Sequence, residues 1–254
     1  MEVHHHSHHP KKWKEYVTEF VMLFAAVTLG FFAENIREHQ IIEHKTKQNL
    51  QSVLLDLKKD SVLIQERTKE YTLATSLLNR LNNNFLDYQY KKITEKEYIE
   101  NAFSISDSIG FGTSFYINNA SYKNTIASGS LSNINSIELK RTISNYYEVY
   151  GAKLYDNNKI LDDVVEYYSV YTLPKPGGRL ANASSLDSST YNLATLKEFY
   201  KSNQLLNHSL LSKEFIIYNQ KALDRVKIYL MLMNLFEQKN NELTALIKEE
   251  LAGK

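Results

Sequence analysis

Residues 16–33, YVTEFVMLFAAVTLGFFA, constrain the fold more than any other part of the sequence, because Glu19 is their only charged residue. A membrane-spanning helix needs about 20 mainly apolar residues. We therefore expect this helix to extend at both ends, over residues 13–36, with Trp13 and Tyr16 at the membrane interface. The alternative is a buried core helix of a soluble protein. The N-terminal position behind a basic cluster favours the membrane anchor.

The flanking residues predict how the anchor is processed and oriented. After Ala33 the sequence continues in helix-forming residues without a signal-peptidase pattern, which favours an uncleaved signal anchor. Lys11, Lys12 and Lys14 precede the apolar run, whereas mixed charges follow it. Lys and Arg mark the cytoplasmic side. We expect a single-pass inner-membrane protein with residues 1–12 in the cytoplasm and residues 37–254 in the periplasm.

Composition favours long helices and narrows the functional classes. The 254 residues include only 8 Gly and 3 Pro, so turns are few. The absence of Cys excludes disulfides, thiolate metal sites and cysteine nucleophiles. The formal net charge of +1 offers no field for nucleic acid, which we do not expect as a partner.

Apolar residues recur at steps of three and four through residue 88, which predicts that the anchor continues into one long helix. Asn82, Asn83 and Asn84 are expected to loosen it. The stripe consists of Leu50, Leu54, Leu57, Ser61, Ile64, Thr68, Tyr71, Leu78, Leu81, Phe85 and Tyr88.

The middle of the chain predicts shorter elements. Thr94 and Glu97 form a capping-box pattern at a helix start. We expect a loop over residues 104–119 and a short helix over 121–127 that ends at Gly129. A helix over 136–171 has an expected inner face of Ile137, Ile143, Tyr146, Tyr147, Tyr150, Leu154, Ile160, Leu161, Val164, Val165 and Tyr168.

The C-terminal part ends in a second long helix. Pro and Gly at 174–178 terminate the preceding helix, residues 180–189 read as a loop, and 193–202 as a short helix. Residues 210–251 have a coiled-coil-like stripe with one gap at Asn240. The predicted fold is all-α, with a single N-terminal transmembrane helix that continues into an extracytoplasmic bundle of long helices.

Two stretches resemble a family of small, signal-anchored Bacteroidota membrane proteins that carry a domain of unknown function. The first is residues 4–39, followed by LLDLKKD at 54–60. The second is SYKNTIASG at 121–129, followed by Ile137-Glu138-Leu139 and Tyr146-Tyr147. The resemblance covers about a third of the chain. It implies the anchored topology and no particular chemistry.

The sharpest local cluster is histidine-rich, at His4, His5, His6, His8 and His9. Neutral imidazole binds zinc, nickel or copper, so this head is the candidate site for a divalent metal, the one cofactor considered. The alternatives are a solvated tail without a role or an affinity tag.

Two features of the anchor suggest packing. Glu19 lies about one turn inside the apolar run, where a carboxylate pairs with a partner, conducts protons, or extends towards Lys12 or Lys14. Ala26, Gly30 and Ala33 share one face and permit close approach of another helix; a lipid-facing role is the alternative.

Three further patterns are weaker. His39, Glu43 and His44 stand close enough for a juxtamembrane metal site, although a solvated surface is the simpler interpretation. Asp-Ser-aliphatic triplets at Ser61 and Ser108 resemble an O-glycosylation acceptor of Bacteroidota; Ser61 should be hidden and Ser108 exposed in a loop.

No catalytic motif is found in the sequence, so we expect no enzyme. The leading hypothesis is a membrane-anchored scaffold or accessory subunit of an envelope complex, which binds other envelope membrane proteins or a second copy. The many tyrosines, such as Tyr146, Tyr147 and Tyr150, suggest spare surface for an interface. The alternatives are an extracytoplasmic ligand-sensing bundle and a metal-binding accessory protein.

Overall fold

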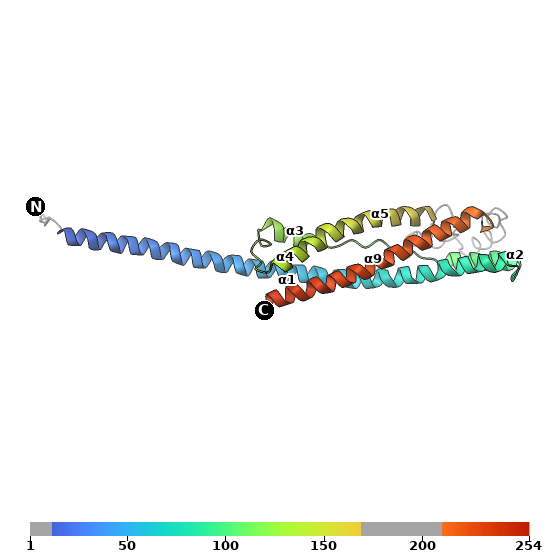
Figure 1. Cartoon of the computed structure of the whole chain (residues 1–254), viewed down its shortest axis with the longest axis horizontal. Coiled ribbons are helices and arrows are strands. Elements are labelled where there is room, and N and C mark those ends of the chain that lie inside the picture. Colours follow the sequence, from blue (N-terminus) through green and yellow to red (C-terminus); the bar gives the residue numbers. More distant parts are fainter. Residues whose placement is uncertain (1–11, 169–209, 254) are drawn as a thin grey trace, which may run out of the picture.

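A computed structural model describes residues 12–168 and 210–253, and all regular secondary structure in these residues is helical. Figure 1 shows an elongated molecule in which one helix extends far beyond a bundle. The histidine-rich head and the elements predicted at 174–178, 180–189 and 193–202 lie outside the described residues.

Helix α1 (Trp13–Gln89) is a single helix of 77 residues, so the predicted continuity from anchor to bundle is confirmed. The expected loosening at Asn82–Asn84 is wrong. Asn84 is buried and donates its side-chain amide to the Tyr98 carbonyl at 2.9 Å, while Asn82 accepts from Asn219. The side chains of Asn82 and Asn84 bond to neighbouring segments rather than to the local backbone. They therefore leave the helix intact.

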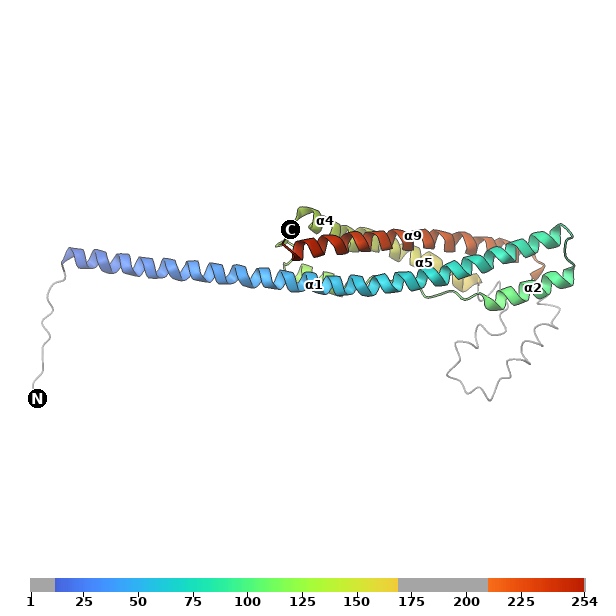
Figure 2. The ribbon, with the colours of Figure 1, turned by 90° about the horizontal axis from the view of Figure 1, so that it is seen from below.

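Helix α9 (Lys213–Leu251) packs along α1, and α5 (Gly151–Tyr167) packs on α9. Figure 2 shows that α9 returns towards the anchor, so the C-terminus lies at the bundle end from which α1 emerges. The predicted stripes form the core. Leu50, Leu57 and Ile64 of α1 are buried. The stripe expected over 210–251 is buried at Phe215, Ala222, Val226, Tyr229, Met233, Phe236, Leu243 and Ile247. This antiparallel arrangement confirms the expected bundle.

Helix α2 (Glu95–Ser108) folds back beside the far end of α1. Its N-terminus carries the predicted capping box, in which Thr94 accepts from the Glu97 N–H and Glu97 accepts from the Thr94 N–H. Lys91 adopts a left-handed conformation (φ 55°) in the connecting turn. The predicted loop begins five residues later than expected, because α2 continues through Ser108.

Residues 109–119, called the strap below, run without regular structure along the bundle to α3 (Ala120–Ala127). The predicted short helix is thus confirmed. Its last residue is Ala127, and the turn that follows contains Gly129, whose φ of +72° costs glycine less than any other residue.

The helix predicted from residue 136 consists of α4 (Ile137–Ser144), a π-helical turn η1 (Asn145–Tyr150) and α5. A π turn rotates less per residue than an α turn, so consecutive Tyr146 and Tyr147 both reach the interior. Ile137 and Ile160 are exposed, which corrects their assignment to the inner face. Ile137 is the first residue of its helix, and Ile160 precedes the buried Leu161.

Candidate functional site

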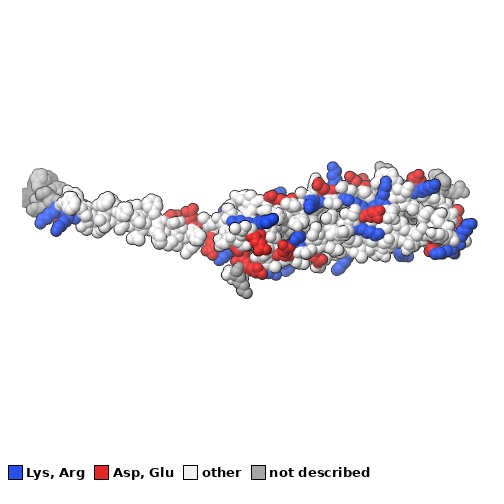
Figure 3. Space-filling model, viewed as in Figure 1, with Lys and Arg blue, Asp and Glu red and all other residues white. Residues whose placement is uncertain are grey.

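The most unusual surface is the free segment, residues 13–45 of α1, which extends beyond the bundle. Every side chain in it is exposed apart from the half-buried Ile42, and packing into the bundle begins at Thr46. Its most apolar 18-residue window has a mean hydropathy of 1.8 and is 0% buried. Figure 3 shows basic residues at its tip, an uncharged stretch, and acidic residues where it nears the bundle.

Among the described residues this is the one helix long and apolar enough to cross a membrane. An N-terminal signal sequence and a core helix of a soluble protein both pass the same test of length and hydropathy. A core helix would be buried, whereas the apolar window of this segment is 0% buried in the part of the chain that the structure describes. The chain therefore carries one long apolar N-terminal helix that its own bundle does not cover.

The predicted anchor residues all lie on this exposed helix. Trp13 is at its first turn, and Glu19 is also exposed. Ala26 and Gly30 are one turn apart on the same face. A Cβ atom added at Gly30 would meet nothing within 4 Å, so no packing contact among the described residues requires a glycine there.

The juxtamembrane histidines do not form a metal site in the structure. Among residues 12–168 and 210–253, no group of three or more His, Cys, Asp or Glu side chains could hold a metal ion. Glu43 instead pairs with Lys47 at 2.7 Å, and His39 and His44 are exposed. The metal prediction for His4, His5, His6, His8 and His9 lies outside the described residues.

The two Asp-Ser-aliphatic serines also differ from expectation. Ser61 is half-buried rather than hidden, because it lies at the border of the packed stripe. Ser108 is exposed as predicted, but it ends α2 and donates to the Ser104 carbonyl at 3.0 Å rather than lying in a loop.

Three helices hold the strap through side chains that satisfy its backbone. Tyr71 of α1 donates to the Gly112 carbonyl at 2.7 Å. The Phe115 N–H donates to the Tyr229 hydroxyl of α9 at 2.6 Å, and the Phe115 carbonyl accepts from Asn158 of α5 at 2.5 Å. A buried segment without regular structure needs such partners, because an unpaired backbone group costs about 1–3 kcal/mol.

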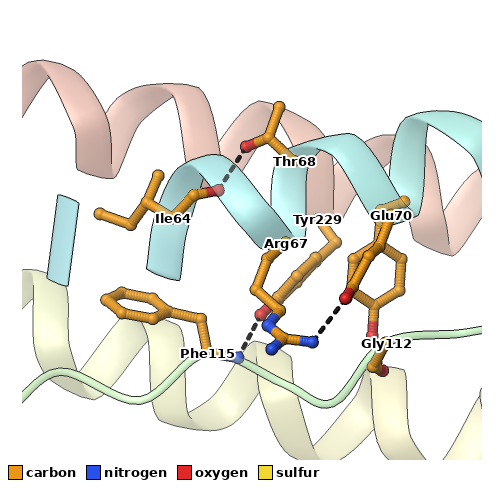
Figure 4. Close-up of polar contacts among 8 residues, drawn as sticks. Ile64, Arg67, Thr68, Glu70, Gly112, Phe115 and Tyr229 are labelled. Atoms are coloured by element: carbon orange, nitrogen blue, oxygen red, sulfur yellow. Dashed lines mark hydrogen bonds and ion pairs between the residues drawn. The ribbon is translucent and has the colours of Figure 1, made fainter. Parts of the chain in front are cut away.

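Gly112 lets the strap approach α1 closely. A Cβ atom there would lie 1.9 Å from Glu70 Oε2 and 2.9 Å from an Arg67 nitrogen. Figure 4 shows the Arg67–Glu70 ion pair directly beside the glycine. Gly112 therefore has a packing role beyond the turn expected from sequence.

Two buried asparagines of α9 each join three helices. Asn240 donates to the Leu57 carbonyl at 2.9 Å and to the Tyr146 hydroxyl at 3.3 Å. Asn219 donates to the Leu78 carbonyl at 3.1 Å and accepts from the Tyr168 hydroxyl at 2.7 Å. The gap at Asn240 in the predicted stripe is thus the position of a buried polar contact. Asn219, three heptads earlier on α9, makes the same kind of contact with α1.

Near the anchor end, Asp56 and Asp60 lie one turn apart on α1 and hold the junction of the strap and α3. Both oxygens of Asp60 accept from the Asn118 N–H, at 3.2 and 3.3 Å. Asp56 accepts from the Asn118 side chain at 3.0 Å and from the Ser121 N–H at 3.2 Å. We call these four residues the acidic junction. Burial raises the pKa of the Asp60 carboxyl from 3.8 to about 7; the Asn118 N–H opposes this rise and the charge of Asp56 adds to it.

Sequence reasoning missed the acidic junction and the Asn219 contact. Asp56 and Asp60 entered as part of a family-like motif, and Asp60 also as the first residue of the triplet at Ser61, although two acids at i and i+4 beside an apolar stripe are a usable signal. Asn219 carried the same signal as Asn240, a polar residue on the inner face of a long helix. The inner-face prediction holds for Tyr146 and Tyr147, which are buried, and for Tyr150, which is half-buried, so the suggestion that these tyrosines provide spare surface for an interface is wrong.

Comparison with known proteins finds no match for this chain among family models, curated proteins or solved structures. The resemblance of residues 4–39, 54–60 and 121–129 to a Bacteroidota membrane family stays an expectation. The geometry of the described residues therefore carries the functional proposal.

Proposed function

We propose that this protein is a single-span inner-membrane scaffold, an accessory subunit that presents a rigid helical bundle in the periplasm. The observation that carries the proposal is the free segment. Its apolar side chains are exposed, yet the helix that bears them continues without interruption into a fully packed core. Exposed apolar surface of this extent is unfavourable in water and favourable in a bilayer.

The dimensions fit an anchor and a rod. Residues 13–36 would form a helix of about 36 Å, enough to cross a hydrocarbon core of about 30 Å. The bundle portion of α1, from Thr46 to Gln89, adds about 66 Å at 1.5 Å per residue. Because the span and the rod are one helix, the bundle is held upright and would reach a partner far from the membrane surface.

The orientation follows from charge. Lys11, Lys12 and Lys14 precede the span and mark the cytoplasmic side. Glu34 and Glu38 follow it, although Arg37 lies between them and pairs with Glu34. The bundle is then periplasmic.

One face of α1 is the proposed interaction surface. Leu55, Val62 and Leu73 are each more than half exposed on the side of α1 away from the core. They are separated by 7 and 11 residues, about two and three helical turns, so they lie in line. In an ideal helix Ala26 and Gly30 fall within about 20° of the same line. We therefore infer one surface that continues from the membrane into the bundle and takes another envelope membrane protein or a second copy of this chain.

A photo-crosslinking amino acid tests the proposal in intact cells. Placed at Leu55, Val62 or Leu73 of the full chain, it should form one discrete adduct with a membrane protein or a second copy. The matched position is Tyr155 on α5, which is equally exposed and should give no discrete adduct. Equal, diffuse labelling at all four positions would contradict the scaffold role. A purified chain that retains a bound small molecule instead would favour the ligand-sensing alternative.

We propose separately that the histidine-rich head binds a divalent metal. If it holds a divalent metal for the complex, deletion of residues 4–9 should alter assembly or growth under metal stress. Unaltered growth and assembly would identify the head as a solvated tail.

A further inference from the structure

The acidic junction contains two carboxylates, those of Asp56 and Asp60, close together inside the protein. Asp60 is fully buried and Asp56 nearly so. Among the residues that the structure describes, no Lys, Arg or His forms an ion pair with either carboxylate. Two buried like charges without a cation are unfavourable, and the usual resolution is that one carboxylate binds a proton.

The groups that face the pair confirm that no cation compensates it. The strap contributes the Asn118 amide, and α3 contributes the Ser121 N–H. The η1 turn contributes two phenols, Tyr146 and Tyr147, whose pKa values rise through burial and also through the charge of Asp60. The Tyr147 hydroxyl is buried without a hydrogen-bond partner. From α9, Asn240 contacts Tyr146. Every facing group is therefore neutral near pH 7.

We propose that the acidic junction is a pH-dependent contact, in which a proton on Asp60 keeps Asn118, near the end of the strap, and Ser121 of α3 closed against α1, and loss of this proton opens them. The junction joins α1 to the strap and α3, and α3 lies close to the point at which α1 leaves the bundle (Figure 1). On the proposed topology, its state would report the pH of the compartment that surrounds the bundle.

The sign of the effect follows from linkage. The pKa of Asp60 is raised from 3.8 to about 7 in the closed form, so the closed form binds more protons across that interval. The opening equilibrium constant then rises about tenfold per pH unit from about pH 4 to about pH 7 and is constant above. The closed junction is most stable in acid and loses this stabilisation as the pH reaches 7.

Hydrogen exchange of the full chain in lipid nanodiscs, resolved to single amides and corrected for intrinsic rates, tests the proposal. The amides of Asn118 and Ser121 should follow the predicted rise with pH. The Phe115 amide, which donates to the neutral Tyr229 hydroxyl, should stay flat. Asp60→Asn should flatten the profiles of Asn118 and Ser121. The control Glu66→Gln, at an exposed acid on α1, should leave them unchanged.

A flat profile in the natural chain, or an unchanged slope in Asp60→Asn, would overturn the proposal. If Asp60→Asn fails to fold, infrared spectroscopy of the natural chain decides. At pH 6 ordinary Asp and Glu side chains are ionised, since their pKa values lie near 4. A protonated-carboxyl band that persists at pH 6 and disappears on titration through 7 is expected, and its absence would refute the proposal.

Discussion

The side-chain amide of Asn240 donates to the backbone carbonyl of Leu57, and this contact fixes the position of α9 along α1. Asn219 donates in the same way to Leu78, so the spacing between the two contacts is 21 residues on both helices. A buried asparagine in a helical seam specifies register at some cost in stability. Two such contacts, about 32 Å apart, make sliding of α9 unfavourable along the whole bundle.

Removing these amides should destabilise the bundle. Asn219→Ala leaves the buried Tyr168 hydroxyl without its acceptor, so we expect a loss of about 1–3 kcal/mol in the free energy of unfolding. Asn240→Ala should cost about 1–2 kcal/mol, and the double variant should be additive because the sites are far apart. Chemical denaturation measures these values. The exposed Asn241→Ala should change stability by less than about 0.5 kcal/mol, and an equal loss there would contradict the assignment.

Register itself can be measured by crosslinking, because the chain has no native cysteine. Gln65 and Glu237 lie opposite each other, with a 3.4 Å contact between their side chains. Cysteines at these positions should crosslink efficiently. When Asn219 and Asn240 are both replaced by Leu, crosslinks from position 237 should spread to cysteines one heptad away, at position 58 or 72. If the crosslink between positions 65 and 237 remained the only one formed, apolar packing alone would set the register.

Tyr229→Phe tests the hydrogen bond between the Phe115 N–H of the strap and the Tyr229 hydroxyl. The Phe115 N–H then loses its acceptor in a buried site, and we expect a loss of about 1–3 kcal/mol in the free energy of unfolding. Tyr155→Phe removes the same atom from a side chain that is 63% exposed, and it should be nearly neutral. Thermal or chemical denaturation of both variants gives the comparison. Equal effects would mean that the Tyr229 hydroxyl is not needed to hold the strap.

Gly30→Leu tests whether the anchor takes part in assembly. A Cβ atom at Gly30 meets nothing within the chain, so the bundle should keep its unfolding midpoint. Close helix approach in the membrane depends on small residues, so assembly in detergent or bilayers should weaken. Ala25→Leu, on a different face of the same helix, is the control. Loss of the fold in Gly30→Leu, or full assembly by both variants, would count against a role for this face.

The long elements could be predicted from the sequence because their signals are local and repeated. Steps of three and four placed α1 and α9 almost to their ends, and the Thr94 capping box located the start of α2. The side-chain contacts that hold the strap could not be predicted. They join residues far apart in the chain, such as Phe115 and Tyr229, and no periodic pattern records such pairs.

Polar residues of the core were misjudged for a related reason. Asn84 looked like a helix breaker by composition, yet its amide has a partner in Tyr98 on the returning helix. Tyr147 was expected on the inner face and also suggested as interface surface; the π turn directs it inward, where it stacks on Tyr122 with ring centres 4.4 Å apart. In both cases tertiary contacts outweigh the local preference.

Single-cysteine labelling tests the anchored topology most directly. Glu66→Cys places an exposed thiol on the bundle, and Ser7→Cys places one in the head. With a membrane-impermeant maleimide on spheroplasts, Glu66→Cys should be labelled without lysis and Ser7→Cys only after lysis. The reverse pattern would contradict the orientation. Protection of both thiols, or recovery of Glu66→Cys in a soluble form cleaved after the apolar run, would contradict the membrane-anchored scaffold.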